Sequence, residues 1–189
     1  MAQFLVTGGA GFIGSNIVAE LVKRGERVRV LDNFSTGNRE NLRPFGDAVE
    51  LVEGSLTDFE TVRIAVRRVD FVLHQGALPS VPRSIEQPLN SNDVNAGGTL
   101  NILVASRDEG VKRVVFASSS SIYGDVDIDR KHEGLSPRPL SPYAVAKMAA
   151  EILRQGFLQS VRTGNCGSQV FQCLWPATES RFTVLGGHP

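Results

Sequence analysis

The sequence is poor in cysteine and tryptophan, with two Cys and one Trp in 189 residues. Cys166 and Cys173 have neither the spacing of metal ligands nor the number needed for a disulfide framework, so we expect no metal site. The longest apolar runs have the length of a β-strand, so we expect no membrane-spanning helix. The 20 basic and 20 acidic residues cancel, so no net charge favours nucleic acid or a membrane surface as a partner.

The amino-terminal segment lacks the pattern of a secretory signal. The chain enters an apolar strand within a few residues of Met1, which leaves no room for a charged region followed by a long apolar one. The composition, 41% hydrophobic and 21% charged, is that of an ordinary globular protein. We therefore expect a cytoplasmic protein whose length suits one folded domain.

Short apolar segments alternate with longer amphipathic ones along the chain. Runs rich in Val, Leu and Phe predict strands over 3–8, 27–32, 49–54, 70–76 and 112–119. Apolar residues three and four apart predict helices over 12–25, 57–69, 92–110 and 141–157. Because the strands are continuously apolar, they predict a parallel sheet covered on both faces, which is a doubly wound α/β fold.

Residue types at the segment ends support several of these boundaries. Gly25 and Gly110 follow two of the helices as C-cap signals, and Thr57 is expected to cap the helix of 57–69 with Glu60 completing a capping box. His74 ends a predicted strand, where we expect a buried structural histidine rather than a metal ligand.

The sequence TGGAGFIG directly follows the first strand and opens the first helix. In such a turn Gly8 permits the tight bend, Gly11 lets the backbone approach a pyrophosphate, and Gly14 lets the helix pack against the sheet. Phosphates bind well at a helix N-terminus, because free N–H groups and the helix dipole both favour negative charge. Three glycines alone are a weak signal, but the strand–turn–helix context predicts a dinucleotide site.

Asp32 ends the second strand, about 20 residues beyond the glycines. A carboxylate there can accept hydrogen bonds from the ribose hydroxyls of adenosine and would repel a 2′-phosphate, which favours NAD over NADP. The alternative is an aspartate that only caps a loop.

Tyr143 and Lys147 are four residues apart on a predicted helix, which places them on one face. An ammonium near a phenol lowers the phenol's pKa, so we expect Tyr143 to act as a general acid and base. Such pairs are also common on exposed helices, and the interpretation gains weight from the serine-rich strand end and the glycine turn upstream.

These motifs together resemble those of the extended short-chain dehydrogenases/reductases, in the NAD-dependent nucleotide-sugar epimerase/dehydratase family. The matching segments are TGGAGFIG, LDN, HQGALPSVPRS, VNAGGTLN, SSSSIYG and SPYAVAK, spread over residues 3–151. The resemblance implies a Rossmann-type fold, bound NAD, a nucleoside-diphosphate sugar such as a UDP-sugar as substrate, and a homodimer formed through the helices of 92–110 and 141–151.

The resemblance also assigns roles to individual positions. It implies Ser119, Tyr143 and Lys147 as the catalytic set, with Ser120 the nearest rival to Ser119, and Ser80, Ser119, Ser120 and Tyr143 as substrate contacts. Ser55 stands where the family more often has Asp, and Gly76 where it usually has Ala. The implied NAD contacts are Gly8, Gly11, Phe12, Ile13, Gly14, Asp32, Asn33, Phe34, Ser35, Thr36, Gly37, Ser55, Leu56, Gln75, Gly76, Ala77, Asn95, Tyr143 and Lys147.

Within the family, the segments around Ser80 and Ser119 resemble most closely the UDP-glucose and UDP-N-acetylglucosamine 4-epimerases. The 4,6-dehydratases of the family carry an acidic pair directly after the catalytic hydroxyl, whereas Ser120 and Ser121 follow it here. The sequence therefore favours 4-epimerisation through transient oxidation at C4. A UDP-glucuronate decarboxylase or dehydratase relative, and a catalytically inactive NAD-binding fragment, remain alternatives.

The last part of the chain departs from this pattern. Residues 1–161 read as the NAD-binding domain, but residues 162–189 show neither a sixth strand nor the substrate-binding domain that the family would add. FQCLWPATE can be encoded by codons that, read one nucleotide later, give FNVFGPRQ, a segment typical of the family. We therefore expect a frameshifted tail, a fifth strand left as an exposed sheet edge, and impaired turnover. Natural divergence of the tail is the alternative.

Overall fold

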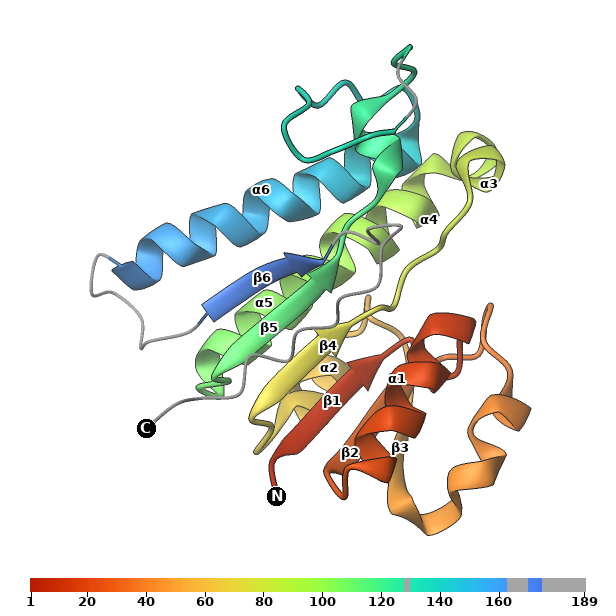
Figure 1. Ribbon diagram of the computed structural model, residues 1–189, viewed down its shortest axis with the longest axis vertical. Coiled ribbons are helices and arrows are strands. Elements are labelled where there is room, and N and C mark those ends of the chain that lie inside the picture. The colour runs from red at the N-terminus through yellow and green to blue at the C-terminus, as the bar shows by residue number, and fades with distance from the viewer. Residues whose placement is uncertain (128–129, 163–169, 175–189) are drawn as a thin grey trace.

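A computed structural model describes residues 1–127, 130–162 and 170–174 of the chain (Figure 1). It contains a six-stranded sheet in the order β3-β2-β1-β4-β5-β6, in which every neighbouring pair is parallel. The strands are β1 (Gln3–Thr7), β2 (Arg27–Asp32), β3 (Val49–Glu53), β4 (Phe71–His74), β5 (Arg113–Ala117) and β6 (Val170–Leu174). The doubly wound α/β prediction is confirmed, and each of the five predicted strands is present.

Helices connect these strands, as the sequence pattern predicts. The α-helices are α1 (Phe12–Lys23), α2 (Phe59–Val66), α3 (Val81–Glu86), α4 (Pro88–Asn92), α5 (Gly98–Asp108) and α6 (Pro142–Arg162). Short 3-10 helices are η1 (Arg39–Asn41), η2 (Arg43–Ala48) and η4 (Ser120–Tyr123), and η3 (Asp93–Gly97) is π-helical. Gly25 and Gly110 follow α1 and α5 with positive φ, as expected for residues that end a helix.

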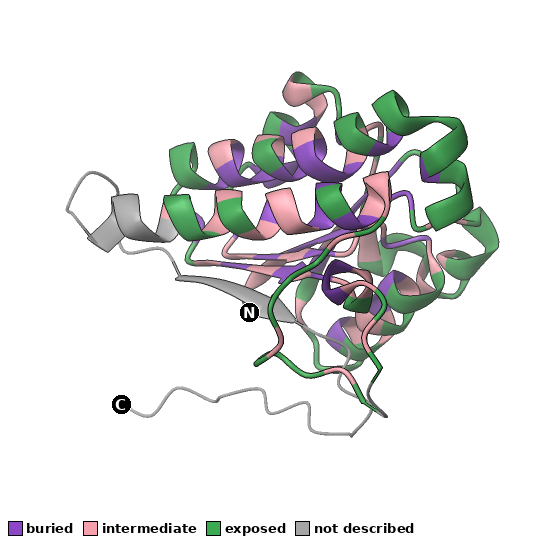
Figure 2. Cartoon of the chain, turned by 90° about the horizontal axis from the view of Figure 1, so that it is seen from above, coloured by how far each residue is buried: buried purple, intermediate pink, exposed green. Residues whose placement is uncertain are grey.

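Two apolar clusters cover the two faces of the sheet. Leu5 of β1 belongs to the larger cluster, where strand residues pack against α2, α5 and the partly buried Leu153 and Phe157 of α6. Val6, the next residue of β1, belongs to the other cluster, with Val18 of α1. This alternation follows from the two-residue period of a strand. Figure 2 shows the result, with buried positions facing the sheet and exposed positions on the outer helix surfaces.

The start of α2 differs from the prediction. The N-cap is Asp58, whose carboxylate accepts from the Glu60 N–H at 3.1 Å and from the Thr61 hydroxyl at 2.5 Å. Thr57 is instead hydrogen-bonded to Ser55, 2.8 Å away between hydroxyl oxygens. Aspartate caps a helix as well as threonine does, so the sequence alone did not separate the two neighbours.

The helix predicted over 92–110 is divided in the structure into the end of α4, the π-helical η3 and α5. The division falls where two glycines follow each other, and a Cβ on Gly98 would approach the Leu56 Cβ to 2.7 Å. The extra residue of a π turn thus occurs where the helix passes closest to the loop after β3. Such turns are frequent near functional sites.

The expectation of a missing sixth strand is wrong. β6 (Val170–Leu174) pairs in parallel with β5, with Arg113 opposite Val170 and Ala117 opposite Leu174. Strand β5 is therefore an inner strand rather than an edge. The segment VFQCL begins with a β-branched and an aromatic residue, two types that favour strands, so a strand signal was present in the sequence.

Candidate active site

A cavity of about 610 Å³ opens at the carboxyl ends of the strands. It lies where the sheet order reverses between β1 and β4, the usual ligand position in an open α/β sheet. Most residues implied by the resemblance line it. They are Gly8, Gly11, Phe12, Ile13, Gly14, Asp32, Asn33, Ser35, Thr36, Gly37, Ser55, Leu56, Gln75, Gly76, Ala77, Tyr143 and Lys147.

The glycine turn closes one side of the cavity. A Cβ on Gly14 would lie 2.1 Å from the Gly8 carbonyl oxygen, and a Cβ on Gly8 would lie 2.8 Å from the Gly76 Cα. Gly8 also has a φ of +66°, which disfavours other residues. Gly11 is the N-cap of α1 and offers no side-chain cap, so the first N–H groups of the helix are left to a ligand.

Asp32 is held in place by backbone N–H groups. One of its carboxylate oxygens accepts from Ala10 at 2.9 Å and the other from Phe34 at 2.8 Å, so the carboxylate bridges the glycine turn and the loop after β2. Phe34 adopts a positive φ of 55°, and the Arg39 guanidinium lies 4.0 Å from the centre of its ring. Phe34 does not line the cavity, but it shapes the loop that does.

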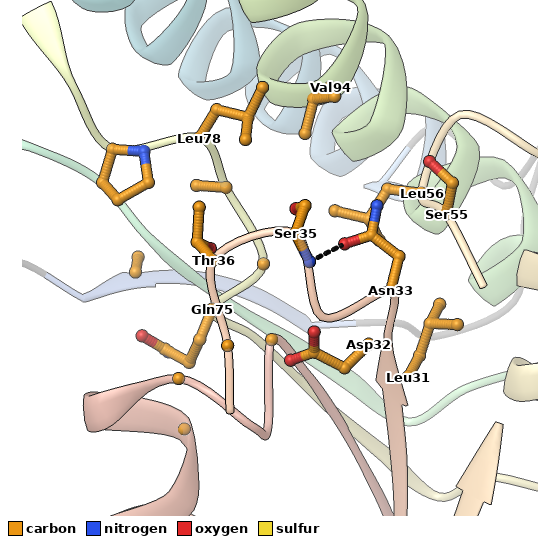
Figure 3. Close-up of a pocket in the computed structure, with 18 of the residues that line it drawn as sticks. Leu31, Asp32, Asn33, Ser35, Thr36, Ser55, Leu56, Gln75, Leu78 and Val94 are labelled. Atoms are coloured by element: carbon orange, nitrogen blue, oxygen red, sulfur yellow. Dashed lines mark hydrogen bonds between the residues drawn. The ribbon is translucent and has the colours of Figure 1, made fainter. Parts of the chain in front are cut away.

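Asn33 and the loop after β3 form the part of the cavity that is farthest from Tyr143 along the sheet (Figure 3). Sequence reasoning placed Ser55 and Leu56 there but missed nine lining residues. These are Leu31, Gly54, Thr57, Leu78, Pro79, Asn90, Val94, Ala117 and Ser118. Asn90 and Val94 come from α4 and η3, four residues apart on one helical face, and only tertiary packing brings that face to the strand ends.

Beneath the cavity, His74 joins β1 to α5 through buried hydrogen bonds. The Thr99 hydroxyl donates to the Asn95 carbonyl at 2.7 Å, so its oxygen accepts from His74 Nε2 at 3.0 Å. Nδ1 of His74 then accepts from the Thr7 hydroxyl at 2.6 Å, whose oxygen accepts from the Gly76 N–H at 3.0 Å. The hydrogen bonds thus assign the neutral Nε2–H tautomer.

The charge state of His74 agrees with this assignment. Burial, and secondarily the positive charge of Lys147, lower the pKa of His74 to about 3. The ring is therefore neutral near pH 7, as the expectation of a structural histidine requires. Its hydrogen bonds hold together the ends of β1 and β4, the two strands between which the cavity opens.

Asn95 acts on the cavity through the loop after β4. Its side-chain oxygen accepts from the Leu78 N–H at 2.8 Å, and its amide nitrogen donates to the Leu78 carbonyl and to the Ser91 hydroxyl. The residue is buried and does not line the cavity itself. Asn95 instead holds Leu78, which does line the cavity. In this structure Asn95 therefore positions a residue of the cavity wall.

Tyr143 and Ser119 are brought together at the β5 end of the cavity. Burial raises the pKa of the Tyr143 phenol, and a hydrogen bond with the Ser119 side chain acts in the lowering direction without cancelling it. The expectation that Lys147 makes this phenol more acidic is therefore not met, because burial dominates. The Ser119 and Ser121 hydroxyls lie 2.8 Å apart, and Ser119 caps η4 by accepting from the Ser121 N–H.

Lys147 is almost fully buried, with 4% of its surface exposed. Its ammonium donates to the Ala117 carbonyl at 3.3 Å and lies 4.9 Å from the centre of the Phe116 ring. The charge is thus held against the end of β5, facing the same cavity as Tyr143 one helical turn away. A buried cation at this point favours negatively charged or electron-rich groups of a ligand.

Three implied substrate contacts, Ser80, Ser119 and Ser120, lie outside the lining of the cavity. Ser80 caps α3, because its hydroxyl oxygen accepts from the Arg83 N–H at 3.2 Å. Ser120 is exposed at the start of η4. Ser119 is the N-cap of η4 and is also not among the lining residues. Among the described residues no group of His, Cys, Asp and Glu is arranged to hold a metal ion. No helix in the same part of the chain is long and apolar enough to cross a membrane.

Comparisons with known proteins agree with the geometry. The chain is 40% identical over 151 residues to the putative UDP-glucose 4-epimerase of Methanocaldococcus jannaschii, in a match that covers 79% of this chain and 48% of that protein. It is 38% identical over 164 residues to the dTDP-glucose 4,6-dehydratase of Mycobacterium tuberculosis, covering 84% of this chain and 49% of that one. The chain thus spans about half the length of these curated relatives.

A solved structure is similar to this chain in both sequence and fold. The UDP-glucose 4-epimerase of Thermus thermophilus, in complex with NAD, superposes with a TM-score of 0.80 at 42% identity, covering 92% of this chain and 54% of that one. The model of the NAD dependent epimerase/dehydratase family matches residues 4–165. Because this match extends over most of the sequence and includes every strand end around the cavity from β1 to β5, the chain belongs to the NAD dependent epimerase/dehydratase family.

Proposed function

We propose that this chain binds NAD, with the pyrophosphate at the glycine turn, the adenosine ribose at Asp32 and the nicotinamide towards Tyr143 and Lys147. The observation that carries the proposal is that these groups line one continuous cavity of about 610 Å³. The residues present fit the cofactor, since α1 begins without a side-chain cap and the Asp32 oxygens, each already holding one N–H, retain lone pairs for ribose hydroxyls.

We further propose that the ancestral reaction is 4-epimerisation of a UDP-hexose or UDP-N-acetylhexosamine. NAD, when bound, supplies the hydride acceptor. Tyr143 would accept the proton of the sugar 4-hydroxyl and return it later, aided by Ser119, whose side chain acts to lower the pKa of the phenol. Lys147 would orient the ligand from the end of β5. Ser120 and Ser121, in place of an acidic pair, favour epimerisation over dehydration.

A second candidate is an NAD-binding module with little or no turnover. It is favoured by the pKa of the Tyr143 phenol, which burial raises, because general acid–base catalysis works best with a group whose pKa lies near the working pH. A UDP-glucuronate decarboxylase or dehydratase relative would share the first oxidation step. Incubating the purified chain with UDP-galactose and UDP-N-acetylglucosamine and separating the products distinguishes the epimerase from the module. Conversion to the 4-epimers supports the enzyme, whereas NAD retention without conversion supports the module.

We also propose a homodimer formed through α5 and α6. Leu100 of α5 and Val145 and Ile152 of α6 are 37%, 51% and 55% exposed, and the two helices pack side by side. Apolar residues aligned on neighbouring helices suit a helix-to-helix interface between two copies. Sedimentation velocity tests this. A monomer across the micromolar range would reject the interface.

For the tail we propose an out-of-frame translation from about Arg162 onward. Residues 163–169 and 175–189 of this tail lie outside the described residues. The support is that the family match ends at residue 165, although the relatives continue well beyond it. Sequencing the coding DNA around codon 162 tests the proposal directly. Codons that are incompatible with the family-like reading one nucleotide later would reject it.

A further inference from the structure

The far end of the cavity is built from the loop after β3 and from η3. Leu56 and Val94 supply apolar side chains, and Ser55 supplies a hydroxyl (Figure 3). Thr57 supplies a second hydroxyl. If NAD binds as proposed, the ribose at Asp32 and the nicotinamide at Tyr143 leave this end for the adenine base. Apolar side chains hold any purine ring alike, so discrimination between bases depends on the polar groups at its edge.

The polar groups here are two hydroxyls that form a pair. Ser55 Oγ and Thr57 Oγ1 are 2.8 Å apart, and Ser55 Oγ also accepts from the Thr57 N–H at 3.2 Å. Two hydroxyls together have two O–H donors and about four lone pairs. The mutual hydrogen bond uses one donor and one lone pair, and the N–H uses another lone pair. Whichever hydroxyl donates, the pair retains one free O–H and lone pairs for a ligand.

No carboxylate competes with this pair at the base, as far as the described residues show. Asp32 is the one acidic residue among those that line the cavity, and its two oxygens are fixed towards the glycine turn and Phe34. The Asn33 side-chain oxygen accepts from the Ser35 N–H at 3.1 Å, which draws it into its own loop. The Asn33 amide nitrogen can still donate, whereas the Ser55–Thr57 pair can both donate and accept at this end.

We propose that the Ser55–Thr57 pair sets the base selectivity of the site and makes it tolerant of the purine 6-substituent. An amino group, as in adenine, would donate to a hydroxyl lone pair. A keto group, as in hypoxanthine, would accept from the free O–H. The site therefore takes NAD and nicotinamide hypoxanthine dinucleotide with similar affinity. This inference rests on the proposed binding of NAD and adds the determinant of its base specificity.

The test is calorimetric titration of the full chain with each dinucleotide. The wild type is expected to bind the two within about threefold of each other. A carboxylate can only accept, so Ser55→Asp should keep the amino group and repel the keto group, giving a preference for NAD of about tenfold or more. Asn38→Asp is the matched control. It adds the same charge outside the cavity lining, at the N-cap of η1 where aspartate also suits, and should leave the ratio unchanged.

A double variant, Ser55→Ala with Thr57→Val, removes both hydroxyls. It should weaken both dinucleotides by about threefold to tenfold and keep their ratio near one, because neither substituent then finds a partner. A wild-type preference for NAD of about tenfold or more, or a Ser55→Asp variant with an unchanged ratio, overturns this inference while leaving NAD binding intact. Absence of binding by either dinucleotide overturns the proposed function and this inference with it.

Discussion

The two sides of the cavity differ in how their functional side chains are held by the surrounding chain. On the side of β1, β2 and β3, backbone N–H groups already hold the Asp32 carboxylate, and the Asn33 side chain is tied into its loop. On the side of β5 and α6, the Ser119 hydroxyl is shared with Ser121, and burial holds the Tyr143 phenol in its protonated form by raising its pKa. The first side thus has the features that the proposed binding of NAD requires, whereas on the second side burial opposes loss of the phenol proton.

This difference separates binding from chemistry. A dinucleotide site made of strand ends and one helix N-terminus needs only the sheet, which this chain has. Proton transfer needs a phenol whose pKa lies near the working pH, and neighbouring charges and solvent exclusion adjust that value. Binding of a dinucleotide and proton transfer can therefore be tested separately in this chain.

The largest expected effect on NAD affinity is on the side of β1, β2 and β3, from Gly14→Ala. The added Cβ would lie 2.1 Å from the Gly8 carbonyl oxygen, so α1 must move away from the turn that is proposed to receive the pyrophosphate. We expect NAD affinity to fall by about 100-fold or more and the free energy of unfolding by about 1–3 kcal/mol. Calorimetry and thermal melting measure the two quantities.

Gly25→Ala is the matched control for that variant. Gly25 has a φ of +74° but open space around its Cβ position, so the substitution costs about 1–2 kcal/mol of backbone strain and touches no ligand. It should destabilise the fold and leave NAD affinity unchanged. Equal NAD affinity in both variants would contradict the part given to the glycine turn.

On the other side of the cavity, Tyr143→Phe should separate turnover from binding. Loss of a general acid and base costs about 100-fold to 10,000-fold in rate, whereas NAD affinity should stay within about threefold. A coupled assay with UDP-galactose at high protein concentration measures the rate. Tyr123→Phe, which changes the other tyrosine of the chain outside the cavity lining, serves as the control. Equal turnover by the two variants would remove Tyr143 from the reaction.

His74 lies between the two sides and gives a pH-dependent stability. Its pKa is about 3 in the folded chain and about 6.5 when unfolded, so the unfolded chain binds one more proton between these values. The contribution of His74 to the free energy of unfolding is therefore fully present above about pH 6.5. It falls as the pH falls, by about 2 kcal/mol at pH 5. Urea unfolding at pH 7 and pH 5 measures the difference.

The control for this effect is His74→Gln. Its amide can donate to Thr99 and accept from Thr7 without titrating, so the loss between pH 7 and pH 5 should shrink to a small remainder. Measurements stay at or above pH 5 because Asp70, whose pKa is lowered by hydrogen bonds from the Gln3 N–H and Lys112, adds its own loss in more acidic solution. An unchanged pH dependence in the variant would show that other groups cause it.

The smallest expected effect comes from Ser80→Ala. Ser80 caps α3, and loss of an N-cap costs about 1 kcal/mol of stability. NAD affinity should not change, since Ser80 lies outside the cavity lining. Denaturation and NAD titration measure both. Turnover that falls further than the loss of folded protein would restore Ser80 to the substrate site implied by the resemblance.

The sequence predicted the side of β1, β2 and β3 better than the side of β5 and α6. Glycine spacing and Asp32 at a strand end depend on local geometry, which a strand–turn–helix pattern encodes within a few residues. Asn90 and Val94 escaped prediction because a helix from elsewhere in the chain brings them to the cavity. The Tyr143 pKa also escaped, because burial, rather than the spacing to Lys147, dominates it.

Two predictions of secondary structure were also wrong, the N-cap of α2 and the absence of a sixth strand. Thr57 and Asp58 both suit an N-cap, and the choice between them depended on the pairing of Thr57 with Ser55. The sixth strand was missed because its residues do not match the family's usual segment, whereas its place in the sheet depends on pairing with β5. Element type was thus predictable from pattern, whereas contacts between distant segments were not.

Calorimetric titration of the purified full chain with NAD measures the proposed binding. We expect saturable heat with one NAD per chain and a dissociation constant at or below about 1 mM, on a sample whose circular dichroism shows an α/β protein. No heat at millimolar NAD on such a folded sample would contradict it.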